Sequence, residues 1–136
     1  MITKITKTFI RTEKTMDAYF KNLKDVEDGK VKSFMDQLDE ISKTGEGVIK
    51  EFKHWFIIEN AFPYDMFAEI NHLLLTKEKK SFSWDNVSQE EKDELELLKK
   101  TYFAENYDVV YENLSSSQTQ PGWFHLHLLK LKRENF

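Results

Sequence analysis

Two histidines separated by one residue are the part of the sequence best suited to chemistry. His125 and His127 flank Leu126 in a stretch where residues alternate. Alternate side chains of a β-strand share one face, so a strand here would place both imidazoles together and Leu126 opposite. A neutral imidazole can attack an electrophile, transfer a proton or bind a metal near neutral pH. The spacing alone equally allows two partly exposed sheet histidines without a role.

A polar loop leads into this stretch. Residues 115–120 contain only Ser, Gln and Thr, and a Pro-Gly step follows. Hydroxyl, amide and backbone N–H groups in such a turn could surround a phosphate or another oxyanion. Asn113 and Asn60 each end an earlier predicted strand, where asparagine more often forms a turn than a ligand contact. The sequence therefore predicts an oxyanion-sized pocket, built from this loop and Asn113, beside His125 and His127.

Composition limits the class of protein. The chain has 136 residues, 40% of them hydrophobic, and a net charge of −4. This length supports one domain with a core, and the negative charge argues against generic nucleic-acid binding. Cysteine is absent, which excludes disulfides, Cys-ligated zinc and thiol catalysis. No segment approaches the ~20 apolar residues of a membrane span, so we expect no membrane partner and a cytoplasmic protein.

Two helices are predicted near the N-terminus. Residues 12–26 and 31–41 carry apolar side chains at helical spacing, and Gly29 and Gly45 are suitable stop signals. Because the apolar stripe of each helix is unfavourable in water, both helices should pack against the domain or against a second subunit. The side chains expected to be buried in this way are Phe20, Leu23, Phe34 and Leu38.

Strands dominate the chain after Gly47. Residues 48–52 and 55–58 read as a hairpin, 66–70 as one helical turn, and 72–75 as a buried strand. A helix should begin at Ser88, which forms a capping box with Glu91, and end at Asn106. The remaining predicted strands are residues 107–111 and 123–131. Segregated helices and strands favour an α+β fold: an antiparallel sheet of about five strands with one long packed helix, plus two N-terminal helices.

Several motifs, taken in order, resemble the histidine triad (HIT) superfamily. They are Trp55-Phe-Ile-Ile-Glu-Asn60, Phe62-Pro-Tyr-Asp65, His72-Leu-Leu-Leu-Thr-Lys77, the helix beginning at Ser88, and Phe124-His-Leu-His-Leu-Leu129. The resemblance covers about residues 47–132. It implies a HIT-like domain over residues 46–136, preceded by a helical extension over residues 1–45.

The family motif is His-φ-His-φ-His-φ-φ, whose middle histidine attacks the α-phosphate of a nucleotide. The resemblance makes His125 the nucleophile, His127 the last histidine and Trp123 the replacement of the first. A shift by two residues, with His127 as nucleophile, stays open. The implied substrate contacts are Asn60 at a ribose, Phe62 at a base, and Asn113, Gln118 and Thr119 at the phosphate.

Three functions are compatible with these residues. The first is a nucleotide phosphohydrolase or nucleotidyl transferase that uses a histidine nucleophile and no obligatory metal or cofactor. The second is a catalytically weak or inactive module that binds a nucleotide or another phosphate-containing small molecule. The third is a metal site, since two histidines and one carboxylate, such as Glu134, can hold iron or zinc. Many HIT relatives are homodimers, so a homodimer is implied by resemblance only.

Overall fold

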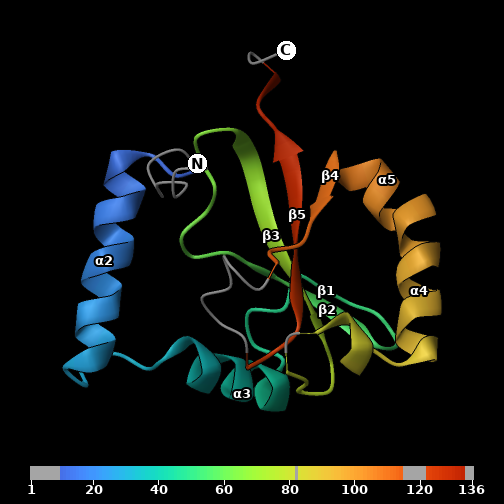
Figure 1. Ribbon diagram of the computed structural model, residues 1–136, viewed down its shortest axis with the longest axis horizontal. Coiled ribbons are helices and arrows are strands. Elements are labelled where there is room, and N and C mark those ends of the chain that lie inside the picture. The colour runs from blue at the N-terminus through green and yellow to red at the C-terminus, as the bar shows by residue number, and fades with distance from the viewer. Residues whose placement is uncertain (1–9, 82, 115–121, 134–136) are drawn as a thin grey trace, which may run out of the picture.

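The computed structural model describes residues 10–81, 83–114 and 122–133, and it contains one five-stranded antiparallel sheet (Figure 1). The spatial order is β1-β2-β3-β5-β4, so the last two strands of the chain complete the sheet beside β3. The strands are β1 (Lys50–Glu51), β2 (Trp55–Glu59), β3 (Ala68–Thr76), β4 (Val109–Tyr111) and β5 (His125–Leu131). The α+β antiparallel architecture predicted from the sequence is therefore confirmed.

Side-chain caps and glycines set the helix ends. Thr12 caps α2 (Glu13–Glu27), Ser33 caps α3 (Phe34–Thr44), and Ser88 forms the predicted capping box of α4 (Gln89–Lys100). Gly45 ends α3 with φ 70°, a left-handed conformation that glycine adopts without steric cost. A short helix, α5 (Tyr102–Asn106), follows α4 and ends at the predicted residue. A single 3₁₀ turn, η1 (Trp84–Asn86), precedes α4.

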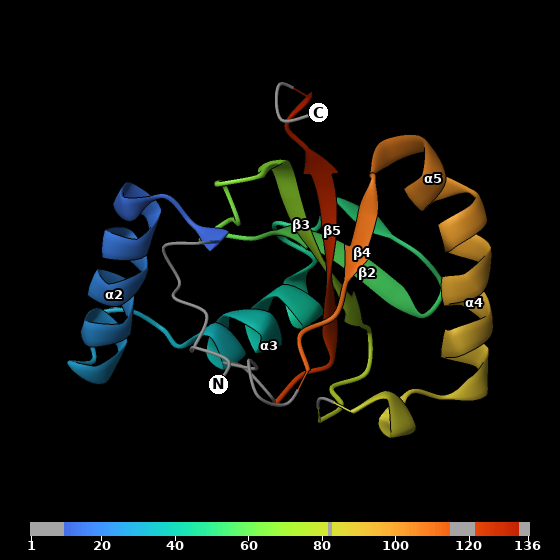
Figure 2. The same ribbon diagram turned by 45° about the horizontal axis from the view of Figure 1, so that its top comes forward.

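The sheet has a different hydrophobic cluster on each face, because residues alternate along β2, β3 and β5. α4 and α5 cover one face, and α3 packs on the other (Figure 2). The α4 side buries, among others, Trp55, Ile57, Leu74, Leu95, Phe124, Leu126 and Leu128. The α3 side buries Leu38, Phe56, Ile58, Leu73, Leu75 and Trp123. His125 and His127 project from the α3 side of β5, which confirms that they share one face.

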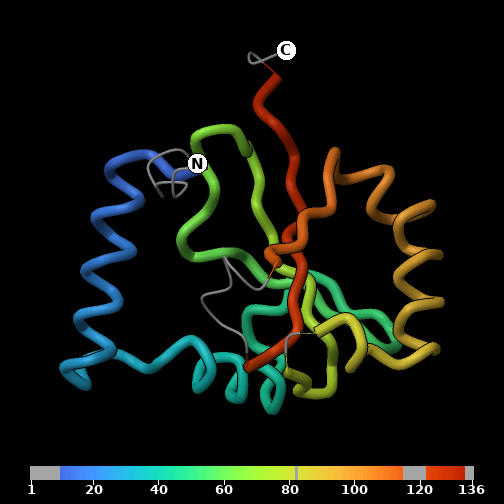
Figure 3. The backbone as a smooth tube through the Cα atoms, in the orientation of Figure 1, coloured from blue at the N-terminus to red at the C-terminus, as the bar shows by residue number. Residues whose placement is uncertain are grey.

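Several predicted boundaries are wrong. The strand expected at residues 48–52 comprises only Lys50–Glu51 (β1), and the second helix begins at Phe34 rather than at Val31. A helical turn was expected over residues 66–70, but only a turn at residues 65–67 forms and β3 starts at Ala68. Pairing with β5, which runs alongside β3 (Figure 3), stabilises this earlier start across a bulge between Ala68 and Ile70.

Burial of the N-terminal stripes is confirmed only in part. Leu38 is fully buried in the α3-side cluster, and Phe34 is half-buried against it. Phe20 and Leu23, by contrast, are 54% and 40% exposed in the single chain. α2 buries Met16 and Tyr19 instead, because it meets the rest of the protein through that flank.

The buried position of Leu38 predicts that α3 contributes to folding stability. Leu38→Ala should lower the free energy of unfolding by about 2–5 kcal/mol, since a buried leucine leaves a cavity that neighbours fill incompletely. Leu97→Ala is the matched control, because Leu97 is 60% exposed on α4 and should cost less than about 0.5 kcal/mol. Urea unfolding of both variants measures the difference. Equal unfolding midpoints would instead make residues 1–45 an independent extension.

Candidate functional site

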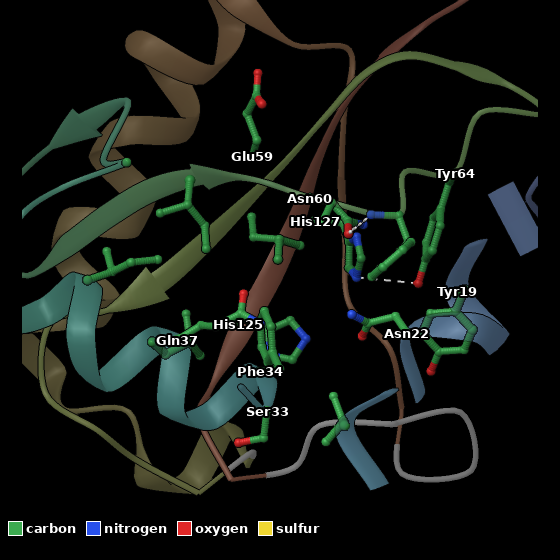
Figure 4. A pocket seen from close by; sticks show the side chains of 18 of the residues that line it. Tyr19, Asn22, Ser33, Phe34, Gln37, Glu59, Asn60, Tyr64, His125 and His127 are labelled. Atoms are coloured by element: carbon green, nitrogen blue, oxygen red, sulfur yellow. Dashed lines mark hydrogen bonds between the residues drawn. The ribbon is translucent and has the colours of Figure 1, made fainter. Parts of the chain in front are cut away.

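A cavity of about 490 Å³ lies between the histidine face of the sheet and the two N-terminal helices. This volume suits a small-molecule ligand. α2 contributes Tyr19 and Asn22 to the wall, α3 contributes Phe34 and Gln37, and β5 contributes both histidines (Figure 4). The two N-terminal helices therefore form part of the cavity wall.

The tautomer of His125 follows from its hydrogen bond to the backbone. Its Nδ1 lies 2.8 Å from the carbonyl oxygen of Trp123, which can only accept a hydrogen bond. Nδ1 therefore carries the proton, and in the neutral ring the lone pair is on Nε2. Burial lowers the pKa of His125, although the Trp123 carbonyl acts in the opposite direction. At neutral pH the ring is thus a neutral imidazole with its lone pair on Nε2.

His127 has the opposite tautomer. Its Nδ1 lies 3.2 Å from the amide nitrogen of Asn71, a donor, so Nδ1 accepts and the proton of the neutral ring is on Nε2. Nε2 lies 3.4 Å from the hydroxyl of Tyr64, which can accept from it. It also lies 3.4 Å from the amide nitrogen of Asn113, a donor whose shorter hydrogen bond, at 3.0 Å, goes to the Tyr64 hydroxyl. Both distances from Nε2 are at the long end of the hydrogen-bond range, so a ligand oxygen could replace these contacts. The pKa of His127 is lowered to about 3, mainly by burial and further by the charges of His125 and Arg11.

Complementary tautomers thus lie next to each other, with the ring centroids of His125 and His127 5.9 Å apart. One ring offers a lone pair on Nε2, and the other offers an N–H. A tetrahedral group such as phosphate has an electrophilic centre surrounded by acceptor oxygens, and could use both at once.

Arg11 supplies positive charge to the cavity wall. Its guanidinium carbon lies 4.8 Å from the ring centres of both Tyr19 and Tyr64, and its Nε donates to the carbonyl of Phe62 at 2.7 Å. The ring of Tyr64 in turn stacks on His127, with centroids 4.5 Å apart. A guanidinium held between two aromatic rings retains its charge and is a suitable partner for a phosphate.

Hydrogen bonds attach the start of α2 to the loop before β3. Asp65 accepts from the backbone N–H of Thr12 at 2.8 Å and from the hydroxyl groups of Thr12 and Thr15 at 3.0 and 2.5 Å. Burial would raise the pKa of Asp65, but these hydrogen bonds outweigh it and lower the pKa. This anchor places Arg11, the residue before Thr12, beside Tyr64.

Of the binding residues suggested by the sequence, Asn60, Phe62 and Asn113 line the cavity together with both histidines. The amide of Asn60 is engaged at both ends, since its Nδ2 donates to Asn71 at 3.0 Å and its Oδ1 accepts from the Phe62 N–H at 3.0 Å. Trp123 is not in the cavity wall: it is 2% exposed and packs against Phe56. Gln118, Thr119 and Glu134 lie outside the described residues.

Arg11, Tyr64 and Asn71 were missed from the sequence. Arg11 falls where the sequence shows no periodicity, and Tyr64 lies in an irregular loop. Asn71 did carry a signal: it occupies the same strand face as Leu73 and Leu75, so it is a polar residue at an apolar position. Such a residue is retained in a core when its amide is fully hydrogen-bonded.

Neither a metal cluster nor a membrane-spanning helix is found among the described residues. No three His, Asp or Glu side chains there lie close enough to hold a metal ion. Likewise, no helix in residues 10–81, 83–114 and 122–133 is long and apolar enough to cross a membrane.

The lowered pKa of His127 predicts that acid destabilises the fold. An unfolded histidine binds a proton near pH 6.5, whereas folded His127 does so near pH 3, so the unfolded state gains protons first as the pH falls. His127 alone should cost about 2 kcal/mol of unfolding free energy between pH 7 and pH 5. His125 and His72, whose pKa values are also lowered, act in the same direction. Urea unfolding at these two pH values tests this, and equal stabilities would contradict it.

Comparison with known proteins finds a likeness among solved structures. No family model matches the sequence, and no curated protein matches it. A solved structure titled "Hit Like Protein" aligns with 68% of this chain and 95% of its own, at 15% identity and a TM-score of 0.49.

Proposed function

We propose that this protein binds a nucleotide, or a closely similar phosphate ester, and cleaves it at phosphorus with His125 as nucleophile. The observation that carries the proposal is the pair of tautomers: Nδ1–H of His125 donates to the Trp123 carbonyl, and Nδ1 of His127 accepts from Asn71. These two contacts support a lone pair on His125 Nε2 and an N–H on His127 Nε2, in rings that line the same cavity. This arrangement supports the alignment with the family motif in which His125, and not His127, is the nucleophile.

The reaction consists of two displacements. The lone pair of His125 Nε2 forms a bond to phosphorus, and the leaving oxygen departs with its bonding electrons. The Nδ1–H stays on the ring, so the intermediate is a cationic phospho-imidazole that the Trp123 carbonyl stabilises. Water or another acceptor then attacks phosphorus, loses its proton to solvent, and returns the electron pair to Nε2. His127 Nε2–H and Arg11 balance the negative charge on the phosphoryl oxygens.

The remainder of the cavity suits a planar or apolar group. Phe62 meets Tyr19 edge-to-face at 5.5 Å, and Phe34 lies edge-on to His125 at 6.1 Å. Leu23, Ile41 and Ile58 extend the apolar wall. A nucleoside combines a flat, largely apolar base with a charged phosphate, which matches a cavity with an apolar part and a cationic part.

A binding module without turnover is the second candidate. The observation that favours it is Trp123, which stands in the place of the family's first histidine and adds no titratable group to the cavity. If proton transfer by that histidine is indispensable, the cavity binds nucleotide and does not cleave it.

Calorimetric titration with the four common nucleoside 5′-monophosphates tests binding. The wild-type protein should bind at least one of them, and Arg11→Gln should weaken binding at least tenfold. Arg133→Gln is the matched control, because it removes the same charge from an exposed ion pair with Asp108, outside the cavity. Equal weakening in both variants would contradict an anion site at Arg11, and no binding by the wild type would reject the proposal.

A further inference from the structure

We propose that Asn71 is a positioning residue that fixes the tautomer and ring orientation of His127, so that Nε2–H faces the cavity. The catalytic consequence rests on the proposed function, whereas the tautomer can be measured without any ligand. Asn71 lies on β3 two residues before Leu73, the residue paired with His127, and on the same face of the strand. It is 5% exposed and does not line the cavity.

The orientation of the Asn71 amide follows from its partners. Its Oδ1 lies 3.0 Å from the backbone nitrogen of Tyr64, which can only donate, and 3.0 Å from Nδ2 of Asn60. Nδ2 must therefore be the end that faces His127 Nδ1 at 3.2 Å, and it also lies 3.3 Å from the carbonyl of His72. Reversing the amide would place its nitrogen against the Tyr64 N–H, two donors without an acceptor.

A donor at Nδ1 has two effects on His127. It excludes the tautomer with a proton on Nδ1, and it disfavours the doubly protonated ring, which would put two N–H groups face to face. The other titratable or charged groups around the ring are His125 on β5, Arg11 before α2, Tyr64 in the preceding loop and Tyr111 on β4. Asn71 contacts Nδ1 at 3.2 Å, closer than the Asn113 amide nitrogen and the Tyr64 hydroxyl lie to Nε2 at 3.4 Å, so we assign the choice of tautomer to Asn71.

Asn71 also connects His127 to the loop that carries Tyr64. The same amide accepts from the Tyr64 backbone and donates to His127, while the Tyr64 ring stacks on the imidazole. The loop and the histidine are therefore held as one unit, and the stacked ring allows the imidazole little rotation. In the proposed reaction this unit aims Nε2–H at a phosphoryl oxygen without itself touching the substrate.

Nitrogen-15 NMR of histidine-labelled, ligand-free protein tests the inference. The His127 signals are identified by their loss in His127→Gln. In the wild type, Nδ1 should give the signal of an unprotonated ring nitrogen and Nε2 that of an N–H, from pH 8 to pH 5. Asn71→Asp keeps the oxygen that accepts from Tyr64 and turns the other end into an acceptor. It should move the proton to Nδ1 and raise the pKa of His127 by about two pH units or more.

Asn22→Asp is the matched control, since Asn22 lines the same cavity without contacting His127 Nδ1. It should leave the tautomer unchanged. A proton on Nδ1 in the wild type, or equal responses to both substitutions, would overturn the inference. If Asn71→Asp does not fold, the wild-type spectrum decides by itself. An Nε2–H tautomer in a protein that binds no nucleotide would uphold the role of Asn71 and reject only the proposed function.

Discussion

His125→Ala should abolish turnover of a nucleotide substrate, lowering kcat by about four orders of magnitude or more. The substitution removes the Nε2 lone pair that, in the proposed reaction, forms the bond to phosphorus. His127 does not replace it, because the proton of its neutral ring is on Nε2. Nucleotide binding should persist, because Arg11 and the apolar wall remain. Turnover and calorimetric affinity, measured on the same preparation, separate the two effects.

Two further variants make this experiment decisive about the alignment. His127→Ala should reduce kcat by about 10²–10³, the usual effect of removing one donor to a developing charge. His54→Ala should leave turnover unchanged, because His54 lies in the β1–β2 turn away from the cavity. Full activity in His125→Ala would eliminate it as the nucleophile, and an inactive His127→Ala alone would favour the alignment shifted by two residues.

Trp123→His should destabilise the protein by about 2–4 kcal/mol. From the sequence, this change restores the family pattern and should preserve or raise activity. In the structure, however, the indole is fully enclosed beside Phe56, and its N–H donates to the Thr76 carbonyl at 2.8 Å. Imidazole is smaller and polar, so it leaves a void in the α3-side cluster and reaches the carbonyl poorly. We therefore expect a melting temperature lower by about 10 °C and no gain in kcat.

Trp84→His is the control for this loss. Trp84 is 39% exposed, so the same exchange removes less buried surface and should cost about 1 kcal/mol. Thermal unfolding of both variants, followed by circular dichroism, measures the difference. A Trp123→His protein as stable as the wild type and more active would show that this position acts in catalysis rather than in packing.

Local signals predicted much of the fold. The capping box of Ser88 and Glu91 fixed the start of α4, and a glycine fixed the end of α3, because such groups act within one helical turn. Alternation in β5 correctly placed His125 and His127 on one face. These features depend on residues close in sequence, so the sequence alone contains them.

Long-range contacts account for what the sequence did not predict. The early start of β3 depends on pairing with β5, and the position of Arg11 depends on the bonds from α2 to Asp65. Whether Trp123 lines the cavity or fills the core depends on Phe56 and Leu38, distant residues that no local pattern identifies. The tautomers likewise require knowing which atom faces each ring nitrogen, as with Asn71.

Trapping the covalent intermediate tests the assignment of His125 as the nucleophile. The wild-type protein is mixed with a nucleoside 5′-phosphate ester of a good leaving group, such as p-nitrophenol, and quenched within milliseconds at alkaline pH to protect the N–P bond. Intact and peptide mass spectrometry then locate any adduct. We predict a nucleoside monophosphate bonded to His125, absent in His125→Ala and present in His127→Ala. An adduct on His127, or turnover of the ester with no adduct at any time, would contradict the assignment of His125 as the nucleophile.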